Sequence, residues 1–201
     1  METATRNGCG RPAASACTRP ESWQNESVTS TSFSIRIARP GDAHAIALMS
    51  RDFIETGLGW RYDAARVVRS MRNRDMVTLV ATERGRVVGF AIMEFGDERA
   101  HLVLLAVLPT HRRMGIGRSL IDWLTESALT AGIESIHLEL RARNQSARRF
   151  YASLGFSETY TVPGYYRGRA GNSEGALRML RMLRQHDGVP YTWRPPRTED
   201  T

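Results

Sequence analysis

The chain has 201 residues, of which 41% are hydrophobic, so it can form one domain with a buried core and short flanking segments. Its formal net charge is +7, and because it contains no lysine, all 28 of its basic residues are arginine. Its two cysteines exclude a disulfide-stabilised scaffold, and its longest apolar run, 102–108, is too short to cross a bilayer, so we expect a cytoplasmic protein without a membrane span.

Hydrophobic patterns divide the chain into a leader, a folded domain and a tail. Residues 1–32 are rich in Ser, Thr, Gly, Pro and Ala without periodicity, which predicts a disordered leader. Residues 33–183 hold the periodic segments, and the proline-containing segment 184–201 is predicted to be a tail. In chain order, the patterns predict a strand at 33–38, a helix opened by 40–42, a helix at 62–71, strands at 76–82, 87–95 and 100–107, a helix at 116–131, a strand at 135–140, a helix at 145–154, and strands at 156–161 and 176–183.

The order of these elements indicates the fold class. The early strands follow one another directly, whereas the later strands alternate with helices. This order predicts an α/β (α+β) fold, in which helices flank a mixed central sheet. The last predicted strand, 176–183, is also rich in Leu, Met and Arg, which would suit a helix as well.

The most informative motif is the glycine-rich segment 112–118, Arg-Arg-Met-Gly-Ile-Gly-Arg. It lies between an apolar strand and a helix. This arrangement can hold a phosphate, because glycines let the backbone approach an anion and the N–H groups of the first helical turn point at it. More arginines follow within 141–149. A polyanionic ligand or a nucleic acid would explain this concentration of positive charge, and so would a solvated basic face.

A second constellation lies downstream of this loop. The spacing Asn-x-x-Ala-x-x-x-Tyr-x-x-x-Gly-Phe runs from Asn144 to Phe156 and describes a capped amphipathic helix. Together with the Arg-x-x-Gly-x-Gly of the loop, it resembles the two signatures of the GCN5-related N-acetyltransferase (GNAT) superfamily. The segment Leu-Glu-Leu-Arg at 138–141 and the later Tyr-Tyr and Glu-Gly-Ala-Leu most resemble the ribosomal-protein-alanine N-acetyltransferase branch, with Gly175 where aspartate is usual.

This resemblance implies an enzyme, an N-acetyltransferase that uses acetyl-CoA as cosubstrate and no metal. It also implies a mainly antiparallel sheet that splays between its fourth and fifth strands. The glycine loop should hold the pyrophosphate, backbone N–H groups of the preceding strand should polarise the thioester, and an asparagine should contact the pantetheine arm. The cofactor-binding residues are then Leu105, Ala106, Val107, Arg112, Arg113, Met114, Gly115, Ile116, Gly117, Arg118 and Asn144.

Acetyl transfer to an amine requires a base for the ammonium proton and favours an acid for the departing thiolate. The resemblance implies that Glu139 is the base, through a water, and we expect partial burial to raise its pKa. The alternatives are a solvent-facing Glu139 paired with Arg141, and His101 as the base. Tyr151 is expected to be the acid, although it could be only a core aromatic. Because both cysteines lie in the leader, we predict direct transfer within a ternary complex.

The acceptor is expected to be a primary amine bound by Tyr165 and Tyr166, followed by Arg167. These tyrosines could instead close the sheet edge. A protein or peptide N-terminal α-amine is slightly preferred to a small-molecule amine. A non-catalytic coenzyme A-binding protein and a nucleic-acid-binding protein are the alternative functions, although the sequence has no recognised nucleic-acid motif. The chain is expected to be a monomer or a homodimer.

Overall fold

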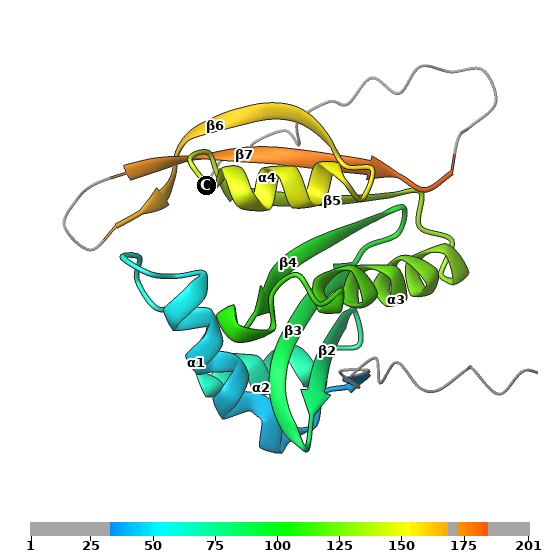
Figure 1. Cartoon of the computed structure of the whole chain (residues 1–201). Helices are drawn as coiled ribbons and strands as arrows, with labels where there is room; N and C mark the ends of the chain where they lie inside the picture. The colour runs from blue at the N-terminus through cyan, green and yellow to red at the C-terminus, as the bar shows by residue number, and fades with distance from the viewer. Residues whose placement is uncertain (1–32, 169–172, 185–201) are drawn as a thin grey trace, which may run out of the picture. The chain divides into compact units, whose positions relative to one another are not determined.

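The computed structural model describes residues 33–168 and 173–184 (Figure 1). The predicted leader at 1–32 and nearly all of the predicted tail at 184–201 lie outside the described residues, and both remain predictions. Among the described residues, no helix combines the length and the apolar character that a membrane span requires.

Seven strands form a single sheet in the order β1-β2-β3-β4-β5-β7-β6. Neighbouring strands are antiparallel except β4 and β5, which are parallel. The mixed, mainly antiparallel sheet expected from the sequence is therefore confirmed. The elements are β1 (Ser34–Ile37), η1 (Pro40–Asp42), α1 (Ala43–Phe53), α2 (Ala64–Arg72), β2 (Met76–Glu83), β3 (Arg86–Phe95), β4 (Arg99–Val107), η2 (Pro109–His111), α3 (Ile116–Thr130), β5 (Ser135–Arg141), α4 (Gln145–Ala152), β6 (Ser157–Arg167) and β7 (Ser173–Met182).

Helices cover both faces of this sheet, and each face has its own hydrophobic core (Figure 1). On one face, α1 and α2 bury Ile46 and Val67 against Phe90 of β3. On the other face, α3 and α4 bury apolar residues such as Leu120 and Leu138. The helical spacing of apolar residues produces these faces, because residues three and four apart point in one direction. The expected flanking of the sheet by helices is confirmed.

The parallel pair β4–β5 is joined only at one end. Its register runs from Arg99 opposite Ser135 to His101 opposite His137. Beyond this point the strands diverge (Figure 1), while β4 stays paired to β3 from Ala100 to Val107. The other edge of β4 therefore has no strand neighbour there among the described residues. The splay expected between the fourth and fifth strands is confirmed.

The last two strands differ in detail from the prediction. β6 extends beyond its predicted end as far as Arg167. A register shift between Val162 and Tyr166 absorbs Pro163, which has no N–H to donate to the sheet. The segment 173–182 forms a strand rather than a helix, because it completes the sheet between β5 and β6.

The start of α1 allows a prediction about stability and pH. Asp42 accepts hydrogen bonds from the guanidinium of Arg36 at 2.7 and 2.9 Å and from the N–H of Arg39 at 2.7 Å. The hydrogen bonds from Arg36 lower the pKa of Asp42 below its ordinary value of 3.8. Such a lowered pKa contributes stability above pH 3.8 that is lost as the pH falls through the folded-state value.

We therefore expect Arg36→Gln to lower the free energy of unfolding at pH 7 by about 1 kcal/mol or less, because the pair is partly exposed. The difference from the wild type should shrink as the pH falls below 3.8. Urea unfolding of the wild type and the variant between pH 7 and pH 3 measures this difference in the free energy of unfolding. A difference that does not depend on pH would contradict the assignment to the Asp42 carboxylate.

Candidate active site

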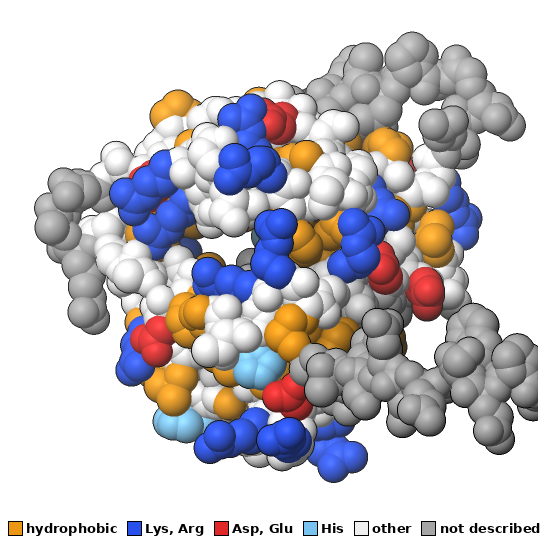
Figure 2. Space-filling model, in the orientation of Figure 1, with side chains coloured by type: hydrophobic (Ala, Val, Ile, Leu, Met, Phe, Trp, Pro, Cys, Tyr) orange, Lys and Arg blue, Asp and Glu red, His pale blue; other side chains and the backbone are white. Residues whose placement is uncertain are grey.

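The splay opens into a cleft of 440 Å³. Figure 2 shows the surface hollowed between the part of the sheet that carries β4 and the part that carries β5, with arginine side chains around the opening. The cleft wall draws on α1, β4, β5, the start of α4 and β6. The predicted site residues that line it are Leu105, Glu139, Asn144, Tyr151 and Tyr166.

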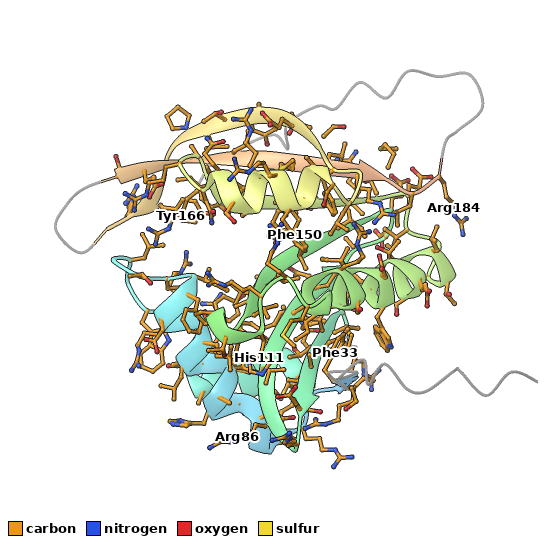
Figure 3. All side chains as sticks on the ribbon, viewed as in Figure 1. Phe33, Arg86, His111, Phe150, Tyr166 and Arg184 are labelled. Atoms are coloured by element: carbon orange, nitrogen blue, oxygen red, sulfur yellow. The ribbon has the colours of Figure 1, made fainter. Side chains whose placement is uncertain are left out.

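The glycine-rich loop forms the turn into α3. Arg113 and Gly115 have positive φ angles of 67° and 83°, a conformation that glycine adopts without strain. Gly115 is the N-cap of α3, and no side chain among the described residues caps this helix. The first N–H groups of α3 are therefore available to an anion. A Cβ at Gly117 would lie 3.0 Å from Cζ of Phe150, which Figure 3 shows between α4 and α3.

Arginine side chains surround this helix start. Arg112, Arg113 and Arg118 are exposed, whereas Ile116 is buried in the core and Met114 is half-buried. Arg112 lies with its guanidinium 5.9 Å from the ring centroid of Phe53, which lines the cleft. Arg118 donates to the carbonyl oxygen of Ser153 at 3.5 Å, just after α4. The positive charge of the loop thus lies beside the cleft.

The β4 and α4 residues predicted to contact the cofactor have different surroundings. Leu105 lines the cleft. Ala106 is buried in the core beneath α1 and α2, and Val107 is half-buried. Asn144 lines the cleft and is the N-cap of α4, since its Oδ1 accepts from the N–H of Ala147 at 3.1 Å. This cap leaves its amide NH₂ free to donate to a ligand.

Glu139 is held by two partners at the floor of the cleft. Its Oε2 shares a hydrogen bond of 2.8 Å with Nε2 of His101, and its Oε1 accepts from Nε of Arg178 at 2.6 Å. The side chain is only 4% exposed. Burial by itself raises the pKa of Glu139, but the hydrogen bond from His101 and the charge of Arg178 outweigh it and lower the pKa from 4.5 to about 2.

One expectation about Glu139 and one of the alternatives to its role as the base are therefore wrong. Its pKa is lowered rather than raised, because partial burial is accompanied by two cationic or hydrogen-bonding partners. It is also not a solvent-facing residue paired with Arg141, whose guanidinium instead donates to the carbonyl oxygens of Ile54 and Thr56 at 3.2 and 2.6 Å. Arg141 thereby ties the loop after α1 to the end of β5.

Tyr151 belongs both to the cleft and to the core. It lines the cleft and packs in edge-to-face contacts with Phe150 and Phe156, with ring centroids 5.1 and 5.6 Å away. Its side chain is buried, and burial raises the pKa of its phenol above the ordinary value of 10.0. The phenol therefore keeps its proton at neutral pH and can donate a hydrogen bond into the cleft.

Tyr165 and Tyr166 lie in β6 and contact each other edge to face, with centroids 4.9 Å apart. Tyr166 lines the cleft and donates to the carbonyl oxygen of Glu139 at 3.2 Å, and Figure 3 shows it below β6 and β7. Tyr165 is exposed. Just beyond them, Gly168 forms a β-bridge with Leu58, so the end of β6 meets the loop between α1 and α2 at this side of the cleft.

Comparisons with known proteins agree with this fold. The model of the Acetyltransferase (GNAT) family matches residues 44–156. The chain belongs to this family. The [Ribosomal protein bS18]-alanine N-acetyltransferase of Escherichia coli K12 is 33% identical over 99 residues, which cover 49% of this chain and 67% of that protein. The resemblance inferred from the two motifs is thus confirmed, and the chain is an N-acetyltransferase.

Solved structures show the same GNAT fold. Ard1 from Thermoplasma volcanium matches with a TM-score of 0.65 and 29% identity, covering 76% of this chain and 99% of that one. NAA60 from Arabidopsis thaliana in complex with acetyl-CoA matches with a TM-score of 0.67 and 18% identity, covering 75% of this chain and 98% of that one. At this identity, NAA60 supports the fold alone.

Two residues around Glu139, Arg178 and His137, were not singled out from the sequence, and the partners of Arg141 were not predicted. Arg178 lies opposite Glu139 in the β5–β7 register. His137 stacks on His101, with centroids 4.6 Å apart and planes 4° apart, and burial together with His101 lowers the pKa of His137 to about 4. Arg141 anchors a loop far away in sequence. Residues alternate between the two faces of a strand, so His137, Glu139 and Arg141 share one face of β5, but no local signal identifies their long-range partners.

Proposed function

We propose that this GNAT acetyltransferase uses acetyl-CoA and transfers the acetyl group directly to a primary amine. One observation carries the proposal: the splay between β4 and β5 opens a cleft of 440 Å³ with a basic, uncapped helix start beside it and the carboxylate of Glu139 in its wall. The family match supports acetyl transfer. The catalytic domain in this proposal comprises residues 33–183, and the cysteine content favours a cytoplasmic location.

The glycine loop is the proposed site for the diphosphate. The N–H groups of Ile116, Gly117 and Arg118 supply donors, and the exposed guanidiniums of the loop supply charge. A backbone N–H of the unpaired β4 edge near Leu105 polarises the thioester carbonyl, in the role of an oxyanion hole. The amide of Asn144 is positioned to contact the pantetheine arm. Each of these groups is supported by its place at the cleft or beside it.

In the proposed reaction, the amine nitrogen attacks the thioester carbonyl carbon, the C–S bond breaks and coenzyme A leaves as a thiolate. An α-ammonium has a pKa of about 8, so most acceptor molecules must first lose a proton at neutral pH. Glu139 accepts this proton through a water. Because its pKa is about 2, Glu139 holds the proton only briefly and passes it to solvent. His101, bonded to Oε2, is the alternative proton acceptor.

Tyr151 is the proposed donor to the departing sulfur. Its raised pKa makes complete proton transfer to a thiolate of pKa about 8.5 unfavourable, so its contribution is a hydrogen bond. We expect Tyr151→Phe to lower kcat by less than the about 10²-fold typical of a general acid, with little change in thermal stability. Steady-state rates and a melting curve test this. An unchanged kcat would remove Tyr151 from the mechanism.

The preferred acceptor is a protein or peptide N-terminal α-amine. The resemblance to the ribosomal-protein-alanine N-acetyltransferase branch supports this choice, because the Escherichia coli relative is named for an alanine of ribosomal protein bS18. The bridge between Leu58 and Gly168 joins the loop after α1 to the end of β6 beside Tyr165 and Tyr166, an arrangement that would suit the end of an extended chain. Mass spectrometry of a panel of N-terminal peptides and polyamines tests it. Acetylation of polyamines with failure of every peptide would assign a small-molecule amine instead.

A further inference from the structure

Two histidines and one carboxylate lie together on one face of the sheet, at the point where the splay begins. His101 of β4 and His137 of β5 are directly opposite each other in the parallel register. Glu139 lies two residues further along β5, on the same face. One potential ligand atom from each residue lies within 4.8 Å of the other two. This proximity does not depend on a chance approach of mobile side chains, because the backbone pairing of β4 and β5 holds the residues together.

We propose that His101, His137 and Glu139 form a binding site for a divalent transition-metal ion such as Zn²⁺. Two imidazoles and one carboxylate match a known three-ligand set for zinc, in which a water or another ligand completes the tetrahedron. Imidazole nitrogens suit Zn²⁺, Ni²⁺ and Cu²⁺, whereas Mg²⁺ and Ca²⁺ prefer oxygen ligands. The site therefore discriminates between these two classes of cation.

Binding requires a small rearrangement of side chains. The stacked rings of His101 and His137 hold their nitrogen lone pairs in two nearly parallel planes, so at least one ring must turn for both to point at one ion. His101 has room to turn, since its side chain is 29% exposed. The ion replaces the proton that Nε2 of His101 shares with Oε2 of Glu139. The potential ligand atoms already lie within 4.8 Å of one another, so small side-chain shifts can bring them to the spacing that metal–ligand bonds of about 2 Å impose.

Arg178 affects the affinity of this site for a metal ion in two opposite ways. It holds Oε1 of Glu139, which leaves Oε2 for the ion and fixes the carboxylate, as outer partners of metal ligands commonly do. Its positive charge also repels a cation. We therefore expect reversible binding that is weaker than at a closed structural zinc site.

An ion at this site occupies the proposed base and should inhibit acetyl transfer. This inhibition rests on the proposed function, whereas the binding of the ion does not. Titration of metal into protein without substrate therefore tests the site independently of any acetyl transfer. Loss of activity with Zn²⁺, reversed by a chelator, then tests the connection between the site and catalysis.

The experiment uses the full chain without a histidine tag, titrated with Zn²⁺ by calorimetry and with Co²⁺ by visible absorption. We expect one ion per chain, tetrahedral Co²⁺ bands, and no response to Mg²⁺. His137→Gln and His101→Gln should each weaken Zn²⁺ binding by at least about tenfold. Even the loss of a residue that only hydrogen-bonds to a metal ligand typically lowers metal affinity by that factor. His44→Gln, at an exposed histidine of α1, is the matched control and should bind like the wild type.

Circular dichroism establishes that each variant is folded. Absence of saturable Zn²⁺ binding at millimolar concentration would overturn the proposal, as would equal affinity in the wild type and in both histidine variants. If Zn²⁺ binds saturably but does not inhibit an acetyl transfer that the chain catalyses, the proposal that the ion occupies the base Glu139 is contradicted. A chain that binds Zn²⁺ at these residues but acetylates no amine would contradict the proposed function and not the site.

Discussion

Glu139→Gln is expected to lower kcat for amine acetylation by about 10²-fold or more, which is the range measured for loss of a general base. The amide keeps the size of the side chain but has no site that can take up a proton. It also removes the charge that pairs with Arg178 at 2.5 Å. Because this carboxylate is proposed to act on the acceptor, the affinity for acetyl-CoA should stay close to that of the wild type.

Initial rates at saturating acetyl-CoA, with calorimetry for the cofactor, measure both quantities. The matched control is Glu126→Gln, an exposed glutamate of α3, which should retain the wild-type rate. The same rates for His101→Gln separate the two candidate bases. If His101→Gln abolishes turnover and Glu139→Gln does not, the imidazole is the base and the carboxylate only positions it. Unchanged turnover in both variants would contradict the assignment of the base to this pair.

Gly117→Val is expected to destabilise the fold by about 1–3 kcal/mol, the usual cost of overpacking, and to abolish measurable acetyl-CoA binding. A Cβ at this position would lie 3.0 Å from Cζ of Phe150, so the added methyl groups must displace the Phe150 ring from its packing between α4 and α3. Because Gly117 lies in the first turn of α3, this strain would also disturb the N–H groups that are proposed to face the diphosphate. One substitution thus damages both the packing and the proposed phosphate site.

Urea unfolding and calorimetry with acetyl-CoA test the two effects of Gly117→Val. Gly41→Val is the matched control, because a Cβ at Gly41 meets nothing within 4 Å and its φ is not positive. Phe150→Leu in the Gly117→Val background should recover part of the stability by relieving the contact. Acetyl-CoA binding of wild-type strength by Gly117→Val would mean that this turn does not hold the diphosphate.

Local patterns were sufficient to predict most of the fold. The strand predicted at 76–82 and the helix predicted at 116–131 both correspond to elements of the structure, β2 and α3. Such patterns succeed because apolar residues are selected at the positions that face the core, which lie on both faces of β2 and on one face of α3. The end of β6 escaped prediction, because the irregularity at Pro163 looks locally like a strand end and only pairing with β7 carries the strand further.

The site could be predicted only in part, since its electrostatics depend on contacts between distant segments. Sequence reasoning selected Glu139, Tyr151 and Tyr166, which line one cleft. It missed the partners of the carboxylate, because Arg178 reaches Glu139 through the β5–β7 register. The hydrogen bond from His101 and the charge of Arg178 together lower the pKa of Glu139, the reverse of the expected direction. The residue types at a site can thus be predicted from motifs, whereas the ionisation of those residues follows from the folded arrangement.

The central claim is that the loop at 112–118 holds the diphosphate of acetyl-CoA beside the splayed edge of β4. Calorimetric titration of the purified chain with acetyl-CoA, and separately with S-acetylpantetheine, which lacks the diphosphate, tests it most directly. We predict saturable binding of one acetyl-CoA per chain and much weaker binding of the fragment. No heat of binding with millimolar acetyl-CoA, or equal affinity for the two compounds, would contradict the claim.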